Sequence, residues 1–326
     1  MVSESGAPDT HGPDDRDPVG RVTLEHADGS TSPLLLVPAT RTGDPVDRVG
    51  AFADPSTPTP DAPRAAAPLA VLVLPGIAVG ARYYLPLARE LAAGGLDVAV
   101  TEIRGQGEST HVPRRGGPPA GYHESAAEDV PAALDALERE FGPRRVVLLG
   151  HSMGAQIGAY HLARRDPRVV GLVGVATQSP WHRGFDAPVG RRLRIGARVL
   201  PLYGLLRGTV PESFFGATGV QPATRIRDWA RLAARGRMQP ARADIDYPSA
   251  LREVTAPVLL VAIAGDDQAP PSAGRELLRL MPAAPSELEV EPTELGHNRW
   301  ARTPGPIVRR VLDWADRTLD GGSTDA

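Results

Sequence analysis

Six short apolar runs dominate the hydrophobic pattern of the chain from residue 69 onward. They are rich in Val, Leu and Ala and lack the strict alternation of a half-buried strand. Runs of this kind are typical of strands that are buried on both faces of a parallel sheet. They occupy residues 69–75, 96–103, 144–150, 168–177, 256–264 and 286–292.

Between these runs, apolar residues recur at the spacing of amphipathic helices. In the last such segment Ile307, Val311 and Trp314 share one face, and a proline stands near its first turn. The regular alternation of strand and helix predicts an α/β fold with a doubly wound, mostly parallel sheet. The helical segments are 83–95, 128–142, 155–166, 272–282 and 305–320.

The pattern differs at the two ends of the chain. Residues 1–19 and 320–326 are polar and without periodicity, so we expect disordered tails. Residues 21–26 and 32–39 flank the turn-like "ADGST", which predicts a β-hairpin. Residues 40–68, rich in Pro, Asp and Ala, are typical of a long surface loop.

A stretch without buried-strand runs interrupts the alternation at residues 178–249. It contains amphipathic fragments broken by Gly and Pro, such as "RRLRIGARVLPLYGLL". We interpret it as a helical cap inserted into a core formed by residues 20–177 and 250–319. Such a cap would cover the carboxyl ends of the strands, where α/β sheets bind ligands.

Composition excludes several classes of chemistry. The 326 residues include no cysteine, which rules out disulfides and thiol nucleophiles. All 36 basic residues are arginine, so Schiff-base and P-loop lysines are absent. The net charge of −3 gives no reason to expect nucleic-acid binding. With no apolar stretch long enough to span a bilayer and no secretory signal, we expect a cytoplasmic protein without membrane association.

The motif Gly150-His151-Ser152-Met153-Gly154 lies between a predicted strand and a predicted helix. This is the setting that a G-x-S-x-G nucleophile elbow requires. The glycines two before and two after the serine avoid clashes at a tight strand-to-helix turn. We therefore predict that Ser152 is a catalytic nucleophile rather than an ordinary serine of a Gly-rich loop.

A serine nucleophile needs a histidine base that is held by an acid, in the chain order Ser, Asp or Glu, His. Of the two histidines downstream, His297 follows the last predicted strand, whereas His182 lies at the entrance of the cap. We predict His297 as the base. The acid is expected after the penultimate strand, where Asp266 and Asp267 are adjacent, and Asp186 is a more distant alternative. Only one of the adjacent pair can face the imidazole, and the other would cap a turn.

An oxyanion hole needs two backbone N–H groups directed at the developing charge. We predict Met153, next to the nucleophile, and Ile77, in the loop after the first run, as the two donors. Gly76 permits the tight turn of that loop and is assigned to the substrate site. No metal or organic cofactor is needed for this chemistry.

From about Ala67 to Leu319 the chain resembles the α/β-hydrolase superfamily. "TEIRGQGEST" is similar to the D-x-R-G-x-G-x-S turn of that superfamily, with Glu102 where Asp is usual. "LPGIAVGARYYLPLARELAAGG", "DWAR", "DDQAPP" and "GHNRW" resemble a bacterial group of predicted hydrolases. In related sequences the acid lies four residues before a proline, and Asp267 keeps that distance to Pro271. The resemblance thus implies Asp267 as the acid.

The resemblance supports the fold and the triad but carries no substrate. The predicted triad implies acyl transfer through a serine ester, so we expect a serine hydrolase of carboxylic esters or thioesters acting on a small acyl substrate. An acyltransferase with the same triad, or an acyl-carrier or coenzyme A thioesterase, is the alternative, followed by a non-catalytic binding protein. Substrate contacts are expected from Trp181, His182 and Trp229 in the cap. The cap carries 12 arginines against 5 acidic residues, which predicts either a positive pocket mouth or a solvated helix surface. We expect no exposed apolar run that could lie on a lipid surface.

Overall fold

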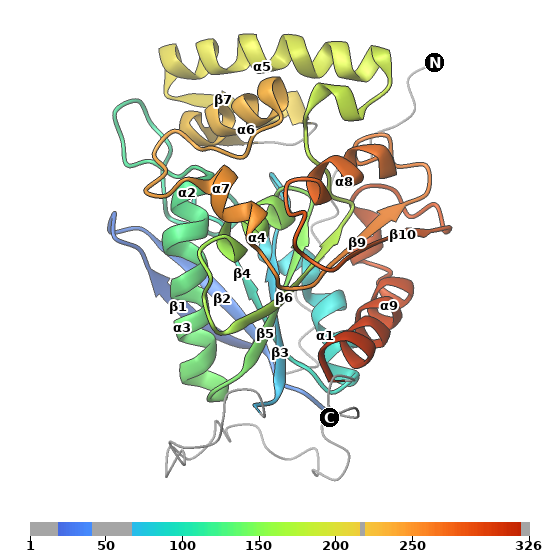
Figure 1. The fold of residues 1–326 in the computed structure, drawn as a ribbon. Helices are drawn as coiled ribbons and strands as arrows, with labels where there is room; N and C mark the ends of the chain where they lie inside the picture. Colours follow the sequence, from blue (N-terminus) through green and yellow to red (C-terminus); the bar gives the residue numbers. More distant parts are fainter. Residues whose placement is uncertain (1–18, 41–66, 216–218, 321–326) are drawn as a thin grey trace.

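The six apolar runs fold as neighbouring parallel strands of one sheet in the computed structural model, which describes residues 19–40, 67–215 and 219–320 (Figure 1). The sheet has eight strands in the order β1-β2-β4-β3-β5-β6-β9-β10. Only β2 is antiparallel to its neighbours, β1 and β4. The strands are β1 (Gly20–Glu25), β2 (Thr31–Val37), β3 (Leu69–Leu74), β4 (Asp97–Thr101), β5 (Arg145–His151), β6 (Val169–Val175), β9 (Val258–Ile263) and β10 (Ser286–Glu291).

Helices cover both faces of the sheet, which confirms the predicted fold class. One face packs against α3, α4 and α8, and the other against α1 and α9. The two expected tails and the loop 40–68 lie almost entirely outside the described residues. The helices of the two layers are α1 (Leu85–Ala93), α2 (Tyr122–Glu124), α3 (Val130–Phe141), α4 (Met153–Leu162), α8 (Pro271–Leu278) and α9 (Gly305–Ala315).

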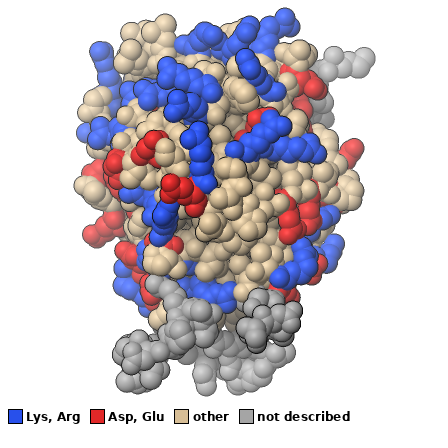
Figure 2. Space-filling view, viewed as in Figure 1, with Lys and Arg blue, Asp and Glu red and all other residues tan. Residues whose placement is uncertain are grey.

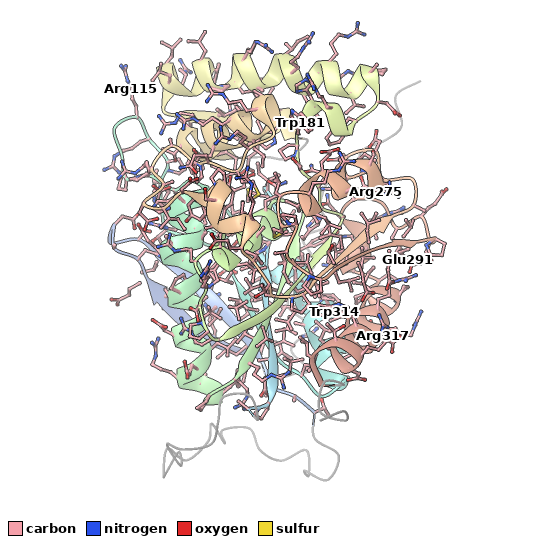
Figure 3. All side chains as sticks on the ribbon, viewed as in Figure 1. Arg115, Trp181, Arg275, Glu291, Trp314 and Arg317 are labelled. Carbon is pink, nitrogen blue, oxygen red and sulfur yellow. The ribbon has the colours of Figure 1, made fainter. Side chains whose placement is uncertain are left out.

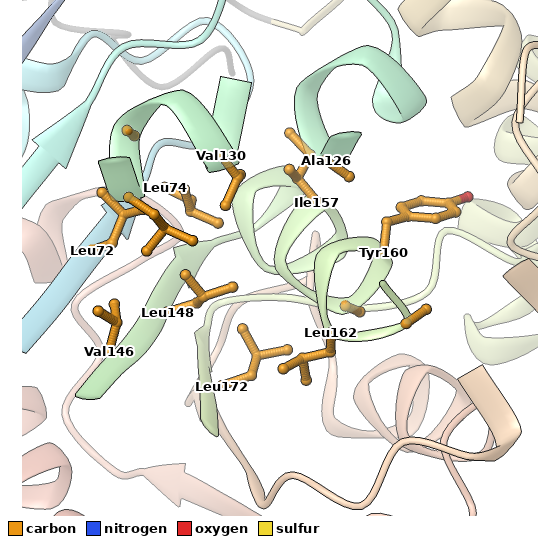
Figure 4. Close-up of a cluster of buried hydrophobic side chains, with 14 of the residues drawn as sticks. Leu72, Leu74, Ala126, Val130, Val146, Leu148, Ile157, Tyr160, Leu162 and Leu172 are labelled. Atoms are coloured by element: carbon orange, nitrogen blue, oxygen red, sulfur yellow. The ribbon is translucent and has the colours of Figure 1, made fainter. Parts of the chain in front are cut away.

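The central strands show why the runs are continuous rather than alternating. In β5, Val146 and Leu148 enter the core on the α3 and α4 side, whereas Val147 and Leu149 enter the opposite core. Figure 4 shows the first of these clusters, with Ile157 of α4 packed over the strands. Because both faces are buried, each position along the strand is apolar.

The last strand differs from the expectation of burial on both faces. β10 is an edge strand whose Glu287 and Glu289 side chains are not buried. Arg310 of α9 pairs with Glu289 and, at 3.1 Å, with Glu291, and Arg317 pairs with Glu287. Charged side chains of this kind protect an edge from pairing with another chain.

Between β6 and β9 the chain leaves the sheet and forms two helices at the carboxyl ends of the strands (Figure 1). α5 (Ala187–Arg207) is one helix of 21 residues with Pro201 inside it, so Gly and Pro do not break it as the sequence suggests. α6 (Ala223–Arg235) packs beneath α5. The boundaries 178 and 249 of a cap stay a prediction. The remaining elements are β7 (Thr209–Pro211), β8 (Val220–Pro222) and α7 (Tyr247–Arg252).

Candidate active site

Ser152 lies on a sharp turn between β5 and α4. Its backbone has φ +50° and ψ −113°, a conformation that a residue with a side chain rarely adopts. A Cβ on Gly150 would lie 2.2 Å from the amide nitrogen of Ala155, and one on Gly154 would lie 2.0 Å from the carbonyl oxygen of Leu74. Both flanking positions therefore require glycine for the turn to form.

His297 connects the serine to a carboxylate. Its Nε2 lies 3.2 Å from Ser152 Oγ, and its Nδ1 lies 2.8 Å from Asp266 Oδ2. A carboxylate can only accept, so Nδ1 carries the proton and Nε2 is free to accept from the hydroxyl. Asp266 is buried, and its other oxygen accepts from the backbone N–H of Gln268 at 3.0 Å. The arrangement has the geometry of a Ser-His-Asp triad.

The acid partner differs from the residue that the resemblance favours. Asp267 is exposed on the rim of the cavity and does not pair with His297, because successive side chains of this loop point in different directions. The sequence contains two adjacent prolines, Pro270 and Pro271. The four-residue spacing selects Asp267 when it is counted to Pro271 and Asp266 when it is counted to Pro270. Asp186 is exposed at the beginning of α5.

The two residues predicted to donate N–H groups lie beside the same cavity as the serine. Ile77 and Met153 both line the cavity that Ser152 lines. The N–H groups on either side of Ile77 are already paired: that of Gly76 with Tyr84 OH at 2.9 Å, and that of Ala78 with Gln106 Oε1 at 3.1 Å. The N–H of Ile77 has no acceptor among the described residues. Met153 begins α4, where N–H groups lack a partner within the helix.

A second histidine, which the sequence analysis did not single out, links the loop of Gly76 and Ile77 to His297. His151 donates from Nε2 to the carbonyl oxygen of His297 at 2.9 Å and accepts at Nδ1 from Tyr84 OH at 2.7 Å. The same Tyr84 oxygen accepts from Gly76. Burial, followed by the charge of His297, holds the pKa of His151 well below its usual range, so it stays neutral. A Cβ on Gly76 would lie 2.7 Å from His151 Nδ1, so this position requires glycine for packing, and Gly76 is not among the residues that line the cavity.

The turn that contains Glu102 supports this loop from the other side. Glu102 Oε2 accepts from the N–H groups of Ala81 and Glu108, at 3.1 and 3.2 Å. Burial raises the pKa of Glu102 to about 7. Gly107, at φ +56°, leaves room for the carboxyl group, which would lie 2.0 Å from a Cβ there. The longer Glu side chain thus replaces Asp by occupying space that the glycine provides.

The site opens into a cavity of about 630 Å³ between the sheet and α5. Its wall is mostly apolar, and Arg192 is the single arginine among the described residues that line it. Trp229, predicted as a substrate contact, is part of this wall. The other apolar side chains from the cap are Pro180, Phe185, Val189, Leu193, Ile195, Val199, Leu200 and Phe214.

Trp181 and His182 do not line this cavity. The Trp181 ring packs against Gly236 at the end of α6 (Figure 3), and Arg183 lies over the ring at 5.5 Å. His182 donates from Nδ1 to the carbonyl oxygen of Ala233 at 3.1 Å. Both residues fasten the segment before α5 to α6, a packing role that their position at the cap entrance does not reveal.

Metal-binding clusters and membrane-spanning helices are both absent from the described residues. No group of three or more His, Asp or Glu side chains there could hold a metal ion. Within the same residues, no helix is both long and apolar enough to cross a membrane.

Comparison with known proteins agrees with this architecture. No curated protein matches the chain. Among solved structures, an esterase from Thermogutta terrifontis with bound malate superposes with a TM-score of 0.57 at 18% identity, over 92% of this chain and 99% of that one. An esterase from Pyrococcus furiosus superposes with a TM-score of 0.56 at 17% identity, over 97% of this chain and 98% of that one.

A thioesterase domain from the curacin biosynthetic pathway gives a TM-score of 0.50 at 16% identity, over 91% of this chain and 100% of that one. At these identities the likeness concerns the fold. The model of the Alpha/beta hydrolase family matches residues 71–310, well over half of the chain. The chain therefore belongs to the alpha/beta hydrolase family.

Proposed function

We propose that the protein is a serine hydrolase that cleaves carboxylic esters or thioesters through an acyl-serine intermediate. The observation that carries this proposal is the alignment of Ser152, His297 and Asp266 beside a cavity that Ile77 and Met153 also line. A structural serine would have no need of a strained backbone, a paired base and a buried acid together.

The reaction follows from the positions of these groups. His297 Nε2 accepts the proton of Ser152 as Oγ attacks the carbonyl carbon, and Asp266 stabilises the resulting imidazolium. The N–H groups of Ile77 and Met153 bind the oxyanion. The carbon–oxygen or carbon–sulfur bond breaks as His297 returns the proton to the leaving group. Water then attacks the acyl-serine by the same route and releases the acid.

The cavity supports an apolar acyl group as the substrate part held by the cap. Apolar side chains dominate the wall, and Arg192 is the one arginine among the described residues that line it. This lining argues against a phosphate-binding mouth at this cavity. Ile195, Val199 and Phe214 line the cavity and are each more than half exposed, so water reaches it. This access supports hydrolysis over transfer to another acceptor.

The proposal is tested with p-nitrophenyl esters from acetate to decanoate and with a fluorophosphonate probe. We expect turnover and labelling by the wild type and neither by Ser152→Ala. If both proteins turn over the esters equally, or if the wild type neither labels nor turns over, the proposed chemistry is wrong. Labelling without turnover, combined with product formation when an alcohol is added, would indicate an acyltransferase.

The size of the acyl group is tested at Gly196 of α5. A Cβ there would lie 3.8 Å from the ring of Trp229, inside the cavity wall. Gly196→Leu is expected to reduce kcat/KM for the decanoate ester at least tenfold relative to the acetate ester, because the added side chain fills the space that the long acyl chain would occupy. An unchanged chain-length profile would place the acyl group elsewhere.

A further inference from the structure

The outward face of α5 carries apolar side chains that no other part of the described chain covers. Ile195, Val199, Leu202 and Leu206 follow one another at intervals of four, three and four residues, so they share one helix face. Their side chains are 55 to 64% exposed. Ala197, Leu200 and Gly204 lie on the opposite, buried face against α6. We call the four exposed residues the α5 stripe.

Arginines border the α5 stripe on both sides. At 100° per residue, Arg191, Arg194 and Arg198 fall on one flank and Arg192 and Arg207 on the other. The helix has no Asp or Glu. In Figure 2 the arginine side chains gather along this edge of the molecule, above the more mixed surface of the sheet domain. An apolar stripe between cationic flanks is typical of a helix that lies at the surface of an anionic membrane.

A basic hollow lies at the carboxyl end of the stripe. Its volume is about 490 Å³, and Leu206 of the stripe lines it. Of the described residues in its lining, three are arginines and none is acidic, namely Arg114, Arg115 and Arg227. The side chain of Arg115 projects outward beside the end of α5 (Figure 3). An anionic headgroup could enter here while apolar chains contact the stripe.

The charge pattern distinguishes a lipid surface from a second copy of the chain. A symmetric contact through α5 would bring ten arginines of the two helices together with no carboxylate from either helix. An anionic bilayer instead neutralises these charges. The stripe also borders the candidate active site, because Ile195 and Val199 line its cavity.

We propose that the α5 stripe and its arginines dock this protein on anionic phospholipid bilayers, with the cavity mouth beside the lipid. The docking itself does not depend on the proposed reaction, since no catalytic group takes part. The exposed stripe itself, rather than the proposed docking, differs from our expectation that no exposed apolar run is present. The sequence alone does not show which apolar positions of residues 195–206 face away from α6, and only the helix brings these four into one exposed stripe.

Vesicle co-sedimentation with the Ser152→Ala chain tests this docking without turnover. The vesicles contain phosphatidylcholine alone or phosphatidylcholine mixed with phosphatidylglycerol. We expect binding to the mixed vesicles that weakens with salt. The double substitution Arg191→Gln with Arg194→Gln should weaken binding to the mixed vesicles about 25-fold, because each cation near an anionic surface contributes about fivefold.

Apolar and charged controls make the test specific. Leu202→Ser with Leu206→Ser should weaken binding at least tenfold and leave the hydrolysis of soluble esters by the otherwise wild-type chain unchanged. Val290→Ser and Arg317→Gln, exposed on β10 and after α9, should not change binding.

Several outcomes would overturn the proposal. These are no binding, equal binding to both kinds of vesicle, or binding that the α5 variants do not weaken. A dimer in sedimentation velocity that Leu202→Ser with Leu206→Ser dissociates would instead assign the stripe to a second copy.

Discussion

Substitution of the two adjacent aspartates separately is the sharpest test of the site. Asp266→Asn keeps the size of the side chain but removes the charge that faces His297 Nδ1 at 2.8 Å. An amide can turn its NH₂ group to that nitrogen, which then becomes an acceptor and leaves the proton on Nε2. In that tautomer His297 can no longer take the proton of Ser152. Asp267→Asn changes an exposed side chain without a contact to His297.

The expected magnitude follows from the role of the carboxylate. Loss of the triad acid lowers kcat about 10⁴-fold in enzymes of this mechanism, equivalent to about 5.4 kcal/mol of transition-state stabilisation. Asp266 is buried, so water cannot replace its charge. We therefore expect kcat to fall about 10⁴-fold for Asp266→Asn. For Asp267→Asn, where water screens the charge, we expect kcat to fall less than about threefold.

The assay is kcat and KM on p-nitrophenyl butyrate, together with circular dichroism to establish that both variants fold. The reasoning is refuted if Asp267→Asn abolishes activity while Asp266→Asn retains it. Equal, small losses in both variants would show that neither carboxylate orients the base. An increase in KM with unchanged kcat for Asp266→Asn would assign Asp266 to substrate binding.

Three further predictions concern the scaffold around the site. Gly154→Ala should lower the free energy of unfolding, measured by urea titration, by about 3 kcal/mol, because its Cβ would lie 2.0 Å from a backbone carbonyl oxygen of β3. In the control Gly158→Ala the Cβ would meet only flexible side-chain ends, so the free energy of unfolding should fall by less than about 1 kcal/mol. His151→Phe removes the hydrogen bonds that connect Tyr84 and the loop of His297, so the predicted oxyanion donor and base lose their fixed positions. We expect kcat to fall roughly 10- to 100-fold with little change in KM. An unchanged kcat would show that His151 is not needed to position these loops. Burial raises the pKa of Glu102 from 4.5 to about 7, so the folded state binds the extra proton and stability falls as pH rises from about 4.5 to 7, by about 3 kcal/mol. Urea titrations across this range should show that Glu102→Gln loses this part of the pH dependence, and a dependence identical to that of the wild type would contradict it.

The sheet could be predicted from sequence because its central strands are buried on both faces. In β3 and β5 each position meets a core, so the apolar run alone identifies them. The edge strand β10 was grouped with the buried runs, although its sequence SELEVE alternates polar and apolar residues as a half-buried strand does. Its partial exposure agrees with its place at the edge of the sheet.

The site could be predicted where topology alone decides. Parallel strands present their carboxyl ends at one edge, so Ser152 after β5 and His297 after β10 had to lie on that edge. The choice between Asp266 and Asp267 depends on the backbone of a single turn, in which the N–H of Asp266 bonds to the carbonyl of Ile263 at 3.1 Å. Neighbouring residues of the same type carry no signal for that direction.

The arginines of the cap show why composition did not decide its role. The chain has no lysine, so a high count of arginine says little by itself. Their surroundings separate three roles. Arg225 is buried and binds Gln221 Oε1 at 2.7 Å and the carbonyl of Arg104 at 2.6 Å, which ties α6 to the turn after β4. Arg192 reaches the cavity, whereas Arg191, Arg194 and Arg198, on the other flank of α5, are exposed. The same residue type thus fastens the cap, borders the substrate cavity and supplies the surface charge on which the proposed docking depends.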